Sequence, residues 1–283
     1  MGKERKPVEK IIVYALLIFI GIMFLSPFIF MISISLASDS TNVKGAFTLI
    51  PKEFHFENYL KIFEKNSAMG AHLRNSIIFV FFCIVGQVFS SSFVAFGFAR
   101  LRAKGKNVLL LMLLATLMIP QDVYIIPQFM LFKKIGWLNT YLPIIVPNFC
   151  GGAFNIFLMR QFFMTIPTTL DDAAKIDGLG YFGIYRRIVL PLMKPILIAV
   201  ALFTFQFNWG WVYGPLVFIQ DREKYPLAVA LKYMQASSGN AVPNWHLVMV
   251  GAMFLTIPPL ITYFFGQKYI LEANIAAGSA SMK

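Results

Sequence analysis

The side chains that most often perform catalysis or hold metals are few and scattered in this sequence. Histidine occurs only at positions 55, 72 and 246, and cysteine only at positions 83 and 150. Their separations do not match the short spacings of metal-binding motifs, and no nucleophile stands beside a base in a recognisable catalytic set. We therefore predict no catalytic residues and no metal site, which argues against an integral-membrane enzyme.

A nucleotide-binding loop is also missing from the sequence. The phosphate loop of ATP-using proteins has the pattern G-x-x-x-x-G-K-[ST], in which backbone amides and the lysine surround the phosphates. The two Gly-Lys pairs, Gly2-Lys3 and Gly105-Lys106, lack both the earlier glycine and the following serine or threonine. We therefore expect this chain to bind no ATP by that device and no cofactor of its own.

Composition indicates a membrane protein. Of the 283 residues, 58% are hydrophobic and only 13% are charged, which is too little charge to cover a soluble domain. The apolar residues form long blocks, each near the ~20 residues that cross a bilayer as a helix. We predict an all-α polytopic membrane protein with six transmembrane helices, at 11–33, 76–99, 108–121 with an extension past Asp122, 142–159, 195–219 and 245–266.

The first block could instead be a signal peptide, because basic residues precede it. Its 23 charge-free residues exceed the roughly 7–15 residues of a signal-peptide core, and it ends in an aromatic stretch that contains Pro27. We predict an uncleaved first span.

The net charge of +12 has two explanations, a nucleic-acid surface or membrane-flanking charge. Lys and Arg occupy the short gaps between apolar blocks, and the gap 100–106 alone holds four of them. Placing the N-terminus inside puts the larger share of the 25 positive charges on the cytoplasmic side. We therefore predict that both termini are cytoplasmic, and that segment 36–74 is an outer loop with one small helix.

The inner loop between the fourth and fifth spans is unusually long and has helix signals. Pro167 and Thr168 open a first helix, which Thr168 or Thr169 caps with an aspartate three residues later. Gly178 then ends this helix in the left-handed conformation.

A second helix is predicted to follow, with one apolar stripe and a stop at Leu190-Pro191. The residues of the stripe are Tyr181, Ile184, Tyr185 and Ile188. Two short helices joined at a glycine are typical of a docking element, and the small Ala173 and Ala174 would let a partner approach closely. The alternative is a plain surface loop.

These residues resemble a known motif. The run Asp172-Ala173-Ala174-Lys175-Ile176-Asp177-Gly178, followed after nine residues by Ile188-Val189-Leu190-Pro191, is similar to the EAA loop of binding-protein-dependent ABC importer permeases. Asp172 stands where that family usually has Glu, so the charge is kept on a shorter side chain. The resemblance implies a cytoplasmic coupling-helix loop, at 165–191, that docks on a separate ATPase subunit. The implied ATPase-coupling residues are Asp172, Ala173, Ala174, Asp177, Gly178, Ile188, Leu190 and Pro191.

The resemblance extends over about 71–266 and favours carbohydrate importers of the maltose type. It rests on segment 154–167, on Ile126-Pro127 with 138–142, and on Asn208-Trp209, Pro215-Leu216 and 225–231. It implies a single membrane domain, 1–283, in the cytoplasmic membrane of a bacterium, acting as the permease subunit of a sugar importer. The implied partners are a second permease subunit, two ATPase subunits that use ATP and Mg, and an extracytoplasmic solute-binding protein.

Polar residues within the blocks are candidates for the substrate pathway, because such residues are costly in lipid and often face a cavity. The candidates are Asn148, Asn155, Gln206, Asn208 and Trp209, with Gln87 and 90–92 beside them. The alternative is hydrogen bonding between helices. For Gly151-Gly152 we expect close helix packing.

Two other transport classes remain open. A peptide or amino-acid importer of the same superfamily would share the inner loop. An ion-coupled secondary transporter would place charges at mid-membrane, where this sequence has almost none.

Overall fold

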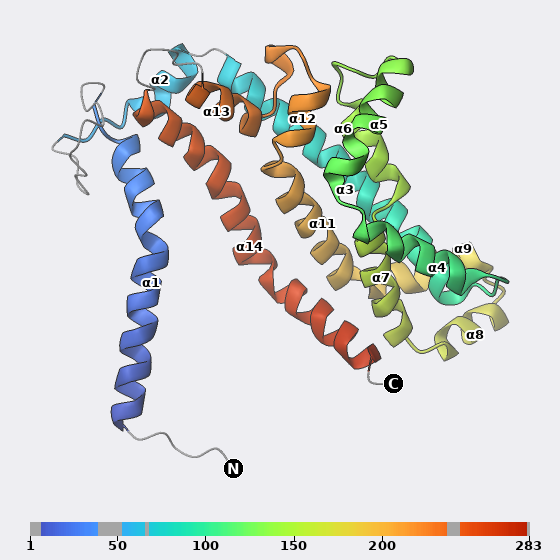
Figure 1. Ribbon diagram of the computed structural model, residues 1–283. Coiled ribbons are helices and arrows are strands. Elements are labelled where there is room, and N and C mark those ends of the chain that lie inside the picture. The colour runs from blue at the N-terminus through green and yellow to red at the C-terminus, as the bar shows by residue number, and fades with distance from the viewer. Residues whose placement is uncertain (1–6, 39–52, 66–67, 237–243, 282–283) are drawn as a thin grey trace. The chain divides into compact units, whose positions relative to one another are not determined.

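The computed structural model describes residues 7–38, 53–65, 68–236 and 244–281, and within these ranges every regular element is helical (Figure 1). The α-helices are α1 Pro7–Ser35, α2 Asn58–Lys65, α3 Ala68–Arg100, α4 Lys106–Ala115, α5 Gln121–Lys134, α6 Leu142–Ile145, α7 Ala153–Thr165, α8 Thr169–Ile176, α9 Tyr181–Ile184, α10 Leu190–Leu192, α11 Lys194–Trp209, α12 Tyr213–Phe218, α13 Leu227–Ala236 and α14 Trp245–Ser281. Short 3-10 turns are η1 Thr116–Met118, η2 Val146–Cys150 and η4 Arg222–Lys224, and η3 Tyr185–Val189 is a π-turn.

The helices confirm a polytopic membrane protein. Four segments are long and apolar enough to cross a bilayer: Val8–Ser35, Ala68–Arg100, Leu142–Thr165 and Trp245–Glu272. Two further segments qualify only as bent pairs, Lys106–Met118 with Gln121–Lys134 and Tyr181–Leu192 with Lys194–Trp209. The described chain therefore has four to six candidate spans.

The third predicted block does not continue as one straight helix past Asp122. The two halves meet at 99°, with Ile119 in an extended conformation before Pro120. Proline disfavours the helical conformation in the residue before it and has no N–H to donate, so the helix ends there. Asp122 consequently lies in the first turn of α5, where the helix dipole favours a negative charge.

Two other blocks are also interrupted by glycine. The predicted span 142–159 contains a break at Gly151, whose φ of 79° no helix accommodates, so α7 begins only at Ala153. The predicted span 195–219 ends as a helix at Trp209, and after Gly210 the chain forms the separate α12.

The described parts of 1–67 and 231–254 form a first compact unit. The predicted small helix of the outer segment is present as α2, whereas 39–52 lies outside the described residues. Asn58 at the start of α2 donates to the carbonyl oxygens of Ser35 and Ala37, both at 2.9 Å, and so caps the end of α1. The Phe254 ring meets those of Tyr59 and Phe63 edge to face, with centroids 6.5 and 5.6 Å apart.

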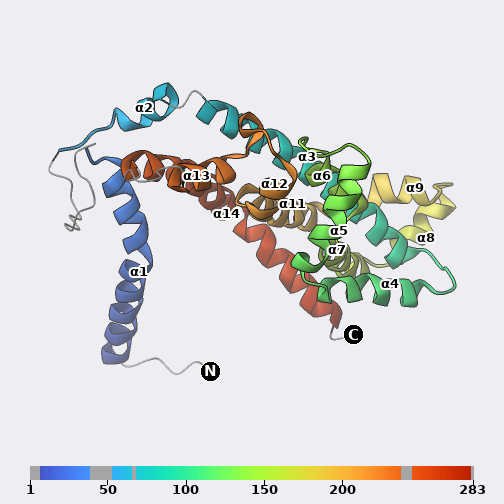
Figure 2. The ribbon, with the colours of Figure 1, turned by 45° about the horizontal axis from the view of Figure 1, so that its top comes forward.

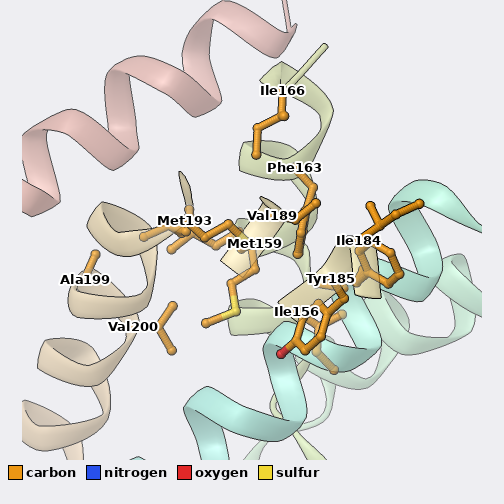
Figure 3. Close-up of a cluster of buried hydrophobic side chains, with 14 of the residues drawn as sticks. Ile156, Met159, Phe163, Ile166, Ile184, Tyr185, Val189, Met193, Ala199 and Val200 are labelled. Carbon is orange, nitrogen blue, oxygen red and sulfur yellow. The ribbon is translucent and has the colours of Figure 1, made fainter. Parts of the chain in front are cut away.

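The second compact unit, 68–230 and 255–283, is organised around α3. Helices α7 and α11 pack along α3, and in Figures 1 and 2 α8 and α9 lie at the same end of this unit as α4. Figure 3 shows the core that these elements share. It joins α7 and α11 to α9 and the turn that follows α9. The buried side chains are those of Ile156, Met159, Phe163, Ile184, Val189, Met193 and Val200.

A polar junction closes the opposite end of this unit. Asn139, with φ of 61°, accepts on its Oδ1 the backbone N–H groups of Gln220 and Asp221. Tyr141 donates its hydroxyl to the Lys224 carbonyl at 2.8 Å.

Helix α3 contributes three more bonds to the same junction. His72 Nδ1 and Asn75 Nδ2 donate to carbonyl oxygens of Tyr225 and Glu223 at 2.8 Å, and Ser76 accepts the N–H of Leu227. The turn from α12 to α13 is therefore held by side chains from two other segments.

Candidate functional site

Helix α8 begins without the predicted side-chain cap. Thr168 is the N-cap residue, but its hydroxyl makes no cap hydrogen bond, so the expected capping by Thr168 or Thr169 is wrong. A capping side chain needs its residue in the extended region, whereas Thr168 has helical angles of −70° and −17°. The carbonyl of Thr168 instead accepts the N–H groups of Asp171 and Asp172 at 3.0 and 3.1 Å.

The end of α8 follows the prediction. Gly178 has a φ of 80°, its N–H donates to Lys175 O at 3.0 Å, and the N–H of Leu179 donates to Ala174 O at 2.9 Å. This is the Schellman pattern, and the accompanying apolar contact comes from Leu179, which packs on the core that contains Ala174. We call α8, this turn and the segment 181–192 the elbow.

The second half of the elbow differs from the predicted stripe. Ile184 and Tyr185 are buried as expected, but Tyr181 is exposed and Val189 takes the core position predicted for Ile188, which is only partly buried. The cause is the π-turn at Tyr185–Val189, which shifts the helical register by one residue. The helix also continues through Pro191, and the bend of 78° comes at Met193 instead.

A buried ion pair, which the sequence analysis missed, fixes the start of the elbow. Arg100 Nε lies 2.8 Å from Asp171 Oδ2, with the two side chains 7% and 9% exposed. They meet at ion-pair distance rather than in an aligned hydrogen bond, and Asp171 Oδ1 has no hydrogen-bond partner within the described chain. The Arg100 guanidinium also donates to Ile166 O at 2.7 Å. The sequence shows charges at both positions but not that they pair.

Tyr185 fixes the other half of the elbow. Its hydroxyl lies 2.8 Å from Ser92 Oγ in the middle of α3, and one of the two donates to the other. Its ring packs against those of Phe93 and Phe96, with centroids 5.7 and 5.3 Å apart. Figure 3 shows this side chain as part of the buried cluster.

The opposite face of the elbow is exposed and partly apolar. Ile176 is 88% exposed, and Leu170, Tyr181 and Phe182 are also exposed. On the same surface Lys175 Nζ bonds Asp172 at 3.0 Å, and this hydrogen bond raises the pKa of Lys175.

The eight predicted coupling residues divide between the two faces. Ala174 is buried in the core, so only Ala173 can admit a partner closely, and the expectation that both alanines do so is wrong. Ile188 and Leu190 pack against the core. The residues left on the exposed face are Asp172, Ala173, Asp177, Gly178 and Pro191.

The predicted pathway residues mostly bond backbone carbonyls within the second unit. Asn148 donates to Ile144 O and Asn208 to Thr204 O, both at 2.8 Å, and the exposed Gln206 donates to Pro259 O at 3.0 Å. Asn155 differs, because its Oδ1 is buried and lacks a hydrogen-bond partner among the residues the structure describes.

Trp209 has a specific partner. Its indole N–H donates to Leu255 O at 2.9 Å. In a helix that carbonyl would accept the N–H four residues later, but that residue is Pro259 and has none. The indole therefore replaces a missing backbone bond of α14.

The break at Gly151-Gly152 packs closely on α3, as expected. A Cβ on Gly152 would lie 2.5 Å from Gln87 Nε2, and one on Gly151 would lie 3.4 Å from Ser91 Oγ of α3 and 3.0 Å from Ile156 Cδ1 of α7. Ser90 donates to Asn148 O at 3.1 Å, and Gln87 donates to Ser91 at 3.1 Å. These polar side chains of α3 serve helix packing here.

Known proteins are similar to this chain over most of its length. Residues 75–274 match the family model of the binding-protein-dependent transport system inner membrane component. The arabinooligosaccharides transport system permease protein AraQ of Bacillus subtilis is 30% identical over 228 residues, covering 81% of this chain and 80% of that one. The polygalacturonan/rhamnogalacturonan transport system permease protein YtcP of the same organism is 29% identical over 279 residues, covering 93% and 95%.

A solved structure is also similar. A chain from the crystal structure of a bacterial ABC transporter involved in the import of the acidic polysaccharide alginate superposes with a TM-score of 0.81 and 25% identity, covering 95% of this chain and 99% of that one. Since the family model spans more than half of the sequence, the chain is a multi-pass cytoplasmic-membrane transport component rather than an enzyme, and it belongs to the family of inner membrane components of binding-protein-dependent transport systems.

Proposed function

We propose that the chain is one permease subunit of an ATP-driven importer for a sugar oligosaccharide, working with a second permease, two ATPase subunits and an extracytoplasmic solute-binding protein. The names of the two Bacillus subtilis relatives support the substrate class. The single membrane domain is 1–283, its core is about 71–266, and the coupling loop is 165–191. The chain binds no cofactor, and ATP with Mg is used by the ATPase subunits.

One observation carries the assignment of the coupling site. Ile176 is 88% exposed on a helix whose other face is anchored in the core by Ala174 and Asp171. A rigid helix with an exposed apolar side chain is suited to bind a groove on a partner protein. Asp172 and Asp177 flank this side chain, and they offer carboxylates to basic groups of the ATPase subunit. The loop and both termini then lie on the cytoplasmic side.

The substrate pathway is proposed to run along the polar residues of α6 to α7 and α11. Asn155 is the strongest member, because its buried Oδ1 can accept a hydroxyl group of a sugar. Asn148, Gln206, Asn208 and Trp209 remain in the proposed set, although each already donates within the chain.

The docking assignment is tested by co-purification of the ATPase subunits with the permease from membranes. Ile176→Ser removes an apolar side chain whose burial contributes about 1.5–3 kcal/mol, so we expect the affinity to fall by at least about tenfold. Ile135→Ser, at an exposed isoleucine just after α5, is the matched control. Equal retention of the ATPase by both variants would contradict the assignment.

The substrate class is tested with the reconstituted complex and its binding protein. We expect arabino-oligosaccharides or galacturonan oligomers to stimulate ATP hydrolysis and to accumulate in vesicles, whereas peptides and amino acids do neither. If peptides stimulated ATP hydrolysis and sugars did not, the substrate class would be peptides rather than sugars. Uphill uptake by the purified chain alone on an ion gradient would refute an ATP-driven importer.

A further inference from the structure

Arg100 occupies a junction of three helices in the second unit. It is the last residue of α3, its guanidinium donates to Ile166 O at the end of α7, and its Nε meets Asp171 in the first turn of α8. Both charged side chains are almost fully removed from solvent. The Arg100–Asp171 pair therefore connects the elbow to the helix at the centre of the core.

This arginine is not explained by membrane orientation alone. The neighbouring Arg102 and Lys104 satisfy the positive-inside rule with exposed side chains, whereas Arg100 turns inward. Removing one partner of a buried ion pair leaves an uncompensated charge, which makes such pairs costly to open. The pair is thus suited to stay closed while the surrounding helices move.

A second attachment joins the elbow to the same helix. The Tyr185 hydroxyl bonds Ser92, which precedes Arg100 on α3 by about 12 Å of helix length. One attachment comes from α8 and the other from the π-turn after α9. Two attachments at different heights fix the rotation of the elbow on α3 as well as its position.

The peptide chain that connects the elbow to α11 is bent. The chain bends by 78° where it enters α11, and Met193 at the bend has non-helical angles of −83° and 2°. Pro191 and Pro195 flank this joint. A displacement of the elbow thus reaches α11 through a bent joint and non-directional apolar packing, but reaches α3 through two buried, directional polar contacts.

We infer that Arg100 and Tyr185 are positioning residues for energy coupling, which lock the elbow to α3 so that both move as one body when the ATPase subunits close. This inference rests on the proposed function of the elbow. It assigns α3, rather than α11, as the helix that receives the motion first.

The first test measures transported sugar per hydrolysed ATP in the reconstituted complex. Asp171→Asn and Tyr185→Phe should each lower this ratio by roughly five- to a hundredfold, the usual range of a coupling between two sites, while the ATPase subunits stay bound. Arg100→Lys keeps the positive charge but cannot span both partners, so it should behave like Asp171→Asn. The controls are Asp122→Asn and Tyr263→Phe, which make the same chemical changes at exposed positions. An unchanged ratio in all three variants would overturn the inference.

The second test does not depend on the substrate. Spin labels at Gly180, where a side chain meets open space, and at the exposed Phe89 report the distance between the elbow and α3 after Cys83→Ala and Cys150→Ser. We expect one distance that ATP binding does not change, and a second, longer distance with Asp171→Asn. A nucleotide-dependent distance with the native pair would overturn the inference even if the sugar proved to be the wrong substrate.

Discussion

Replacing Gly178 by alanine isolates the backbone contribution of the turn that joins α8 to α9. Gly178 has a φ of 80°, and a Cβ built there meets no atom within 4 Å. The substitution therefore adds no clash, and its whole effect is the strain of a left-handed residue. Gly180, two residues later in the same turn, also has open space but a φ of −73°, so Gly180→Ala is the matched control.

The left-handed conformation costs a residue with a Cβ about 1–2 kcal/mol, which corresponds to a factor of roughly 5–30 in a local opening equilibrium. The opening breaks the bonds from Gly178 and Leu179 to the last carbonyls of α8. Amide exchange of Leu179 measures that opening directly. We expect exchange faster by this factor in Gly178→Ala, less acceleration in Gly178→Asn because asparagine tolerates the conformation, and none in Gly180→Ala.

Transport gives the functional counterpart of this measurement. A looser turn holds the exposed face of the elbow less rigidly. The Gly178→Ala complex should therefore transport less sugar for each ATP hydrolysed. The reasoning fails if the Leu179 amide exchanges equally fast in Gly178→Ala and in Gly180→Ala. The Schellman turn would then contribute nothing to the rigidity of the elbow.

Two other substitutions test contacts inside the second unit by thermal unfolding in detergent. Trp209→Phe should destabilise the chain by about 0.5–1.5 kcal/mol more than Trp211→Phe, because it leaves the partly buried Leu255 carbonyl without its indole donor; equal shifts would contradict the role of the indole. Gly151→Ala should cost about 1–3 kcal/mol, because its φ of 79° and ψ of 153° lie in a region that only glycine adopts readily, with further loss from the contact its Cβ makes, whereas Gly210→Ala should be nearly neutral; a stable Gly151→Ala protein would refute the tight break.

Features set by local sequence were predictable. The apolar blocks indicated the membrane segments, and Gly178 indicated the end of α8, because both depend on residues that are adjacent in the chain. The bend at Pro120 and the end of α11 at Gly210 were missed, although proline and glycine were visible there. The charge-free length of a block indicates that it can cross a bilayer, but it does not indicate where the helix breaks.

Features that depend on tertiary packing were not predictable. Arg100 and Asp171 are 71 positions apart, and each had a sufficient local explanation, as a membrane-flanking charge and as a first-turn carboxylate. The π-turn could not be read from the apolar stripe either, because the stripe assumes regular helical spacing. Only burial of Val189 in place of Ile188 reveals the shifted register.

The junction between α12 and α13 has a consequence for how this region can vary. His72, Asn75 and Tyr141 recognise the carbonyl groups of residues 223–225 rather than their side chains. Every amino acid supplies such a carbonyl. The exposed side chain of Glu223 is therefore free to be exchanged to suit a neighbouring protein without loosening the turn, whereas the three donors are not exchangeable.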